Sequence, residues 1–181
     1  RGLGDVYKRQ AKPSARAATT ANLSATYSNG SAGVGATLTA SSNGAITMDG
    51  VSPVVNDRIL VKDQTAPAQN GIYVVTTQGD GSTPFVLTRA TPEDQPAELS
   101  GGSFIFVEEG TANGDNGYVF THTGQPTFGT TALDVTQFSG AGQITAGAAL
   151  SKSGNQMDVE VDNSSIEAVS YTHLTLPTTS F

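Results

Sequence analysis

Short apolar runs that alternate with polar residues recur along the middle of the chain, and Gly, Asn, Asp or Pro separates one run from the next. An alternation with a period of two is typical of a β-strand whose two faces meet different surroundings. The pattern predicts about eight short strands, at residues 36–40, 45–50, 58–62, 72–77, 85–89, 103–109, 117–123 and 132–138. Short strands at this spacing favour an all-β fold, either a compact antiparallel sandwich or a small barrel, and leave the strand order open.

Two segments depart from this simple alternation. Residues 103–109, SFIFVEE, carry large apolar side chains on both faces, which indicates a strand in the middle of a sheet. In residues 91–98, Thr91 is a good N-cap, Pro92 suits a first helical position, and Pro96 stops propagation. We therefore expect one helical turn between two strands.

The stretch DRILVKDQTAPAQNGIYVV, residues 57–75, places a polar loop between two apolar runs. The loop contains no nucleophile, general base or set of metal ligands, and Pro67 restricts its backbone. Asn70 and Gly71 are suited to the left-handed backbone that returns a chain into the next strand. The stretch is therefore interpreted as a hairpin connection.

Composition shifts divide the chain into five parts. Residues 1–10 and 169–181 differ in character from the rest and resemble translated sequencing-adapter sequence, so we leave them out of fold reasoning and expect the natural protein to continue beyond both. Residues 11–33 are small and polar and are expected to form an extended lead-in, followed by a β domain at 34–139. Residues 140–168 form an extended segment rich in Gly, Ala and Ser, which predicts a linker or the start of a trimeric fibre shaft.

The charged residues exclude one class of partner. Between the two ends, six basic residues face fifteen acidic ones, and such a surface repels the phosphates of nucleic acid. No apolar run is long enough to span a bilayer, so membrane insertion is not expected. There is no cysteine for disulfides or thiolate chemistry. Arg58 and Arg89 are expected to pair with nearby acids such as Asp57 or Asp94 at strand ends.

Motifs that would support catalysis or cofactor binding are missing. His122, the one histidine between the two ends, follows an aromatic strand face and is expected to be a half-covered rim residue, since no G-x-S-x-G elbow is present. Candidate carboxylates for a glycosidase lack a defining motif; they are Asp94, Glu98, Glu108, Glu109 and Asp115. Residues 49–57 and 113–117 are rich in oxygen ligands but do not follow a calcium-loop pattern. We therefore predict no catalytic residue, no cofactor and no metal.

Four blocks of sequence occur in the order of a known module: AATTANLSATYSNGSAGVGATLTA, MDGVSPVVNDRILVKDQTAPAQNGIYVV, LTRATPEDQPAELSGGSFIFVEEGTANGDNGYVF and FSGAGQITAGAALSKSGNQMDV. Together they cover residues 17–162 and resemble a module of bacteriophage tail-fibre and related virion-fibre proteins. The resemblance implies a non-enzymatic structural role in the virion, usually as a homotrimer that contributes to host attachment. It supplies no catalytic motif that maps onto this chain.

Two alternative functions stay open. A module that binds host-surface glycan or another receptor would need exposed aromatic and amide side chains on loops. The available candidates are Tyr27, Asn70, Asn113, Asn116 and His122. A capsule-polysaccharide hydrolase is the third and least favoured interpretation.

Overall fold

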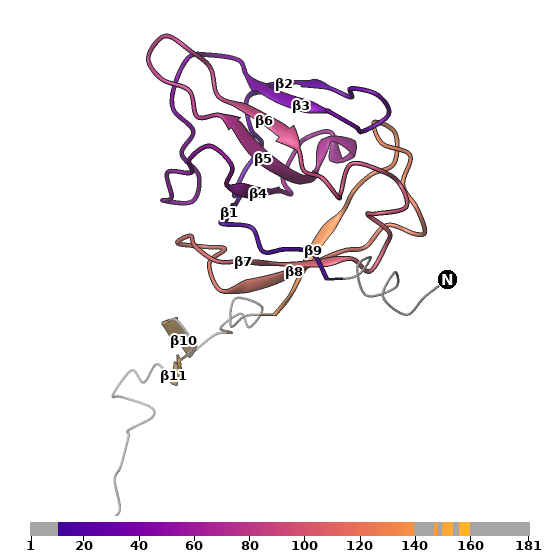
Figure 1. Ribbon diagram of the computed structural model, residues 1–181. Coiled ribbons are helices and arrows are strands. Elements are labelled where there is room, and N and C mark those ends of the chain that lie inside the picture. The colour runs from indigo at the N-terminus through magenta and orange to yellow at the C-terminus, as the bar shows by residue number, and fades with distance from the viewer. Residues whose placement is uncertain (1–10, 140–146, 148–149, 154–155, 160–181) are drawn as a thin grey trace, which may run out of the picture. The chain divides into compact units, whose positions relative to one another are not determined.

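The computed structural model describes residues 11–139, 147, 150–153 and 156–159, which belong to two units divided at Gly140. The first unit is all-β, as the hydrophobic pattern predicts, and its strands form two sheets (Figure 1). Within the described residues, helical structure is limited to the 3-10 turn η1, Pro67–Gln69, in the loop of the predicted 57–75 hairpin.

The larger sheet has six strands. They are β1 (Ala17–Ala18), β2 (Ala25–Ser28), β3 (Thr37–Ala40), β4 (Arg58–Val61), β5 (Gly71–Thr77) and β6 (Val86–Arg89). Their order is β1-β4-β5-β6-β3-β2, with β1 parallel to β4 and the other neighbours antiparallel. The predicted strands at 36–40, 58–62, 72–77 and 85–89 are confirmed, and the 57–75 stretch is a hairpin in which Val61 is opposite Gly71.

The smaller sheet contains β7 (Phe104–Val107), β8 (Asn116–Phe120) and β9 (Val135–Ser139), all antiparallel in that order. The prediction that 103–109 runs through the middle of a sheet fits β7, which pairs with β8 on one side and bridges to Ala11 and Ala15 on the other. The two apolar faces of β7 are not covered equally. Ile105 and Val107 are buried, whereas Phe106 on the opposite face is 48% exposed. The pattern showed that both faces are apolar, but the tertiary structure covers only one of them.

The two faces of the larger sheet are packed in different ways. Leu60 and Ile72 point toward the smaller sheet and join a core with Ile105, Phe120 and Leu133, so the two sheets form a sandwich. The alternate positions of the same strands meet a second core on the far face. Its members include Ile59, Val61, Tyr73, Val75, Ile46 and Met48. Because both faces are buried, β4 is apolar at three consecutive positions.

Residues 11–19 tie the two sheets together, which corrects the prediction of a separate lead-in at 11–33. The backbone N–H of Ala15 donates to the carbonyl of Phe106 in β7, and that of Thr19 donates to Leu60 in β4. Figure 1 shows this indigo segment passing from the smaller sheet to the larger one. The segment shows little strand pattern in the sequence because its buried apolar residues are alanines, which carry little β-strand signal.

Two further predictions from local pattern are wrong in detail. Residues 45–50 do not form a strand, although Ile46 and Met48 are buried and Thr47 between them is exposed, as the alternation requires. Residues 91–98 form turns and bends without a helical turn. The hydroxyl of Thr91 bonds to the carboxylate of Asp94 at 3.0 Å, so this side chain does not cap a helix.

The second unit contains an antiparallel pair of strands, β10 (Leu150–Ser153) and β11 (Gln156–Val159). Leu150 is opposite Val159, and these side chains are 40% and 63% exposed. Most of the predicted linker or shaft segment at 140–168 lies outside the described residues, as do residues 1–10 and 169–181.

Candidate functional site

Four of the five predicted contact residues are buried, so the expectation that they are exposed on loops is wrong. Asn70 is 3% exposed; its Oδ1 accepts the backbone N–H of Gln64 at 3.0 Å, and its Nδ2 donates to the carbonyl of Leu133 at 3.2 Å. Asn116 donates to the carbonyl of Ala112 at 3.2 Å. These amides hold loops to the body of the protein.

His122 and Tyr27 are also engaged within the fold. His122 is 9% exposed, and its Nε2 lies 3.2 Å from the carbonyl oxygen of Leu99, so it is more deeply covered than the predicted rim position. Tyr27 is half-buried, and its hydroxyl donates to Oδ1 of Asn29 at 2.7 Å. Of the five predicted residues, Tyr27 alone presents a substantial surface to solvent.

The two oxygen-rich segments meet in the fold, but their oxygens accept hydrogen bonds from N–H groups. The carboxylate of Asp49 accepts the backbone N–H groups of Ala112 and Asn113, at 2.9 and 2.8 Å, and the side-chain amide of Asn113 at 3.0 Å. Tyr118 donates its hydroxyl to Oδ1 of Asn113 at 2.6 Å. A search of the described residues finds no group of three or more His, Asp or Glu side chains that could hold a metal ion. The arrangement anchors the 110–115 loop.

Arg58 is paired with an acid other than the two that the sequence suggested. Its guanidinium donates to the carboxylate of Glu93 at 2.8 Å, and the Glu93 side chain is fully buried. Lys12 lies close by and donates to the carbonyl of Glu98. Burial lowers the pKa of Lys12, an effect that Glu93 and Glu98 oppose. The neighbouring Asp57 pairs with Arg16 at 2.6 Å.

Arg89 is 3% exposed, and among the described residues it forms no ion pair with a carboxylate, contrary to the prediction. Two of its guanidinium nitrogens donate to the carbonyl of Asn70, each at 3.2 Å. Its guanidinium carbon lies 4.9 Å from the ring centre of Tyr73 and 4.5 Å from that of Phe128. These contacts lock the end of the 57–75 hairpin against the body of the protein.

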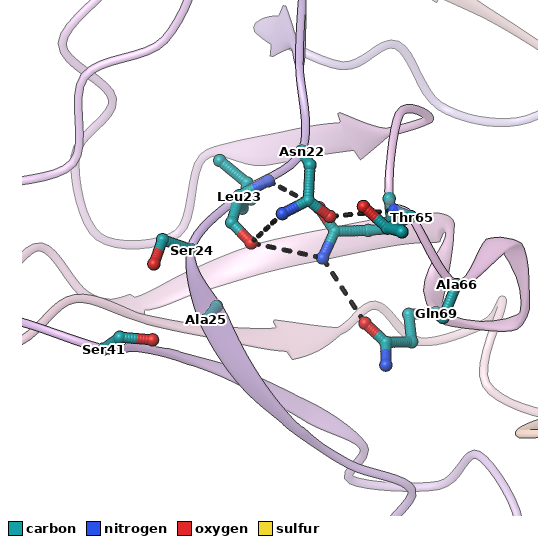
Figure 2. A pocket seen from close by; sticks show the side chains of 9 residues that line it. Asn22, Leu23, Ser24, Ala25, Ser41, Thr65, Ala66 and Gln69 are labelled. Carbon is teal, nitrogen blue, oxygen red and sulfur yellow. Dashed lines mark hydrogen bonds between the residues drawn. The ribbon is translucent and has the colours of Figure 1, made fainter.

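A shallow polar hollow lies beside the same hairpin, with a volume of about 350 Å³. Figure 2 shows the hydrogen bond that links Asn22 with Thr65 at its rim, where the backbone N–H of Thr65 donates to Oδ1 of Asn22 at 2.8 Å. Gln64 accepts the backbone N–H of Leu23 at 2.7 Å. The lining consists of amides, hydroxyls and small apolar groups without a charged side chain, so the hollow is suited to a neutral, hydrogen-bonding ligand.

A second hollow of about 270 Å³ has an apolar lining and lies on the outer face of the smaller sheet. It is lined by Phe104 and Phe106 of β7, Val119 of β8 and Phe138 of β9. The three phenyl rings contact one another edge to face, with ring centres 5.8 to 6.2 Å apart. These four side chains are called the phenylalanine face below.

The register of the strands explains the shape of the phenylalanine face. Phe106 is opposite Gly117, which has no side chain, so a gap opens between the rings. Phe104 is opposite Val119, whose short side chain forms the floor. The site was not predicted from the sequence, because a strand in the middle of a sheet was not expected to leave its phenylalanines exposed. Gly117 could have indicated a gap in the sheet beside Phe106, but a glycine at this position is equally typical of a turn.

Comparisons with known proteins found no matching family model, no similar curated protein and no similar solved structure. None of the described residues forms a helix with the length and apolar character that crossing a membrane would need. The two hollows and the C-terminal hairpin are therefore the features of the chain that suggest a function.

Proposed function

We propose that this protein is a non-catalytic structural module of a bacteriophage tail fibre or related virion fibre. In this role it holds its shape within a homotrimer and contributes to host attachment. The proposal is supported by the sequence blocks between residues 17 and 162 and by the all-β body. The observation that carries it is the exposed apolar pair Leu150 and Val159 on the β10–β11 hairpin.

A two-stranded hairpin is at best marginally stable in water unless something packs against it. Leu150 and Val159 are directly opposite each other, so their side chains share one face of the hairpin. The next pair, Ser151 and Asp158, is polar and occupies the other face. The exposed Leu150–Val159 pair gains its missing burial when the same faces of several copies meet around an axis.

The full chain provides the test. Sedimentation velocity or light scattering after size exclusion is expected to give about three times the 18.5 kDa chain mass. The double variant Leu150→Ser/Val159→Ser is expected to shift the mass toward that of the monomer, while Ser151→Ala on the polar face leaves it unchanged. A wild-type chain that stays monomeric at high concentration would contradict the proposal.

The polar hollow of Figure 2 favours a second candidate function, binding of host-surface glycan. Its exposed Asn22 and Thr65, with Gln69 alongside, offer donors and acceptors that suit sugar hydroxyls. Glycan-array binding by the wild-type chain that is lost in Gln69→Ala would support this function. Release of reducing ends from capsule polysaccharide would instead point to a hydrolase and contradict both proposals.

A further inference from the structure

The phenylalanine face is an apolar feature that the described residues of the body leave partly uncovered. Phe106 and Phe138 are 48% and 46% exposed, although each ring already contacts the other two. Scattered exposed valines occur elsewhere and are ordinary for a protein surface. Three phenyl rings around one hollow are different, because grouped apolar side chains mark a surface that gains free energy when it is covered.

We propose that this face is a contact surface for a second copy of the same chain. The inference rests on the proposed function and adds to it a specific surface on the body. Because Phe106 faces Gly117, the hollow beside it has room for an apolar side chain from the neighbouring copy. Aromatic side chains that fill such gaps supply most of the binding free energy in protein interfaces.

The charge of the chain restricts where two associated copies can make contact. Each copy carries a formal net charge of −7, so two copies repel each other over most of their surfaces. The phenylalanine face has no charged side chain. Thr136, which is opposite Val119 in the same sheet, is also uncharged. Two copies can therefore meet there without bringing like charges together.

The place of this face in the chain supports the same occupant. Phe138 lies in β9, which ends at Ser139, immediately before the segment to which the proposed function assigns self-association. Copies held together by that segment have a high effective concentration of one another's phenylalanine faces. This matters because a stable interface buries about 800 Å² on each partner, which is more than the exposed parts of three phenyl rings can supply. The contact is therefore an auxiliary one that adds to the C-terminal association.

The absence of cysteine from the chain allows a direct test. Thr136→Cys places a single thiol at position 136, which is exposed to solvent. A short bismaleimide is expected to link two full-length chains through this thiol. Ser82→Cys, in the exposed loop at 80–83 of the other sheet, is the matched control and is expected to give no link beyond background. Phe106→Ser/Phe138→Ser is expected to abolish the Thr136→Cys cross-link and to raise the dissociation constant at least tenfold.

A second variant identifies other occupants. The chain has no tryptophan, so Phe106→Trp introduces a single tryptophan on the face, which can be excited selectively over the tyrosines. Its emission is expected to move to shorter wavelengths as the protein concentration rises. An emission that is already short-wavelength and does not change with concentration would show that a segment of the same chain covers the face, which would overturn the inference.

The outcomes also separate the two proposals. This inference alone is overturned if the chain is oligomeric, its mass is unchanged by Phe106→Ser/Phe138→Ser, and the Thr136→Cys variant does not cross-link. A monomeric wild-type chain overturns the proposed function and this inference with it. Circular dichroism of each variant checks that the β-fold is retained.

Discussion

The guanidinium of Arg58 donates a 2.8 Å hydrogen bond to the carboxylate of Glu93, whose side chain is completely shielded from solvent. The pair joins β4 to the 91–99 loop, which the sequence suggested would contain a helical turn. Removing one member of a buried ion pair leaves the other charge without compensation, and that cost exceeds the net value of the intact pair.

Arg58→Met is therefore expected to destabilise the protein by about 3–5 kcal/mol. The double variant Arg58→Met/Glu93→Leu is expected to recover most of that loss, because it removes both charges. Urea unfolding of the single and double variants measures the difference. A double variant as unstable as Arg58→Met would show that the loss comes from packing and not from the stranded carboxylate.

Gly71→Ala is expected to destabilise the protein by several kcal/mol, because backbone strain and steric overlap act together. Gly71 has a φ of +145°, and a Cβ at this position would lie 2.2 Å from a guanidinium nitrogen of Arg89. Arg89 cannot move aside freely, since it is held between the rings of Tyr73 and Phe128. The midpoint of urea unfolding measures the effect.

Gly81→Ala is the matched control for that variant. Gly81 lies in an exposed loop, and a Cβ added there would meet no atom of a non-neighbouring residue within 4 Å. Its stability is expected to stay close to that of the wild-type chain. Equal stability of the two alanine variants would contradict the locked arrangement of Arg89.

The carboxyl of Glu98 makes the stability depend on pH. Burial raises its pKa above the ordinary value of 4.5, and Asp94 adds to the rise, while the backbone N–H of Gln95 opposes it. The folded protein thus binds this proton more tightly than the unfolded chain does. The contribution is fully present below the unfolded pKa and is lost as the pH rises through the folded pKa.

Glu98→Gln removes this titration and keeps an acceptor for Gln95. The stability of the wild-type chain relative to this variant is expected to fall as the pH rises above the ordinary carboxyl pKa of 4.5. Asp80→Asn is expected to show the opposite trend, because hydrogen bonds from Ser82 lower the pKa of Asp80 and its contribution is lost as the pH falls. Urea midpoints across the pH range measure both trends, and parallel trends would contradict the assignment.

The sequence by itself determined the β class, most strands of the body, the hairpin at 57–75 and the division near residue 140. Strand period and turn residues are local properties, so positions such as Ile59 and Val61 identify their shared face without any knowledge of the fold. Even at 45–50, where no strand forms, the alternation correctly showed that Ile46 and Met48 are buried.

Only the tertiary structure decided what lies against each face. The alternation in 103–109 marks two apolar sides, but distant residues cover Ile105 and leave Phe106 exposed. Asn70 and Asn113 lie in segments whose composition is typical of exposed loop tips. The fold buries them nevertheless, because their side-chain amides donate hydrogen bonds to backbone carbonyls far away in the sequence. Burial depends on which segments meet in space, and a local pattern does not contain that information.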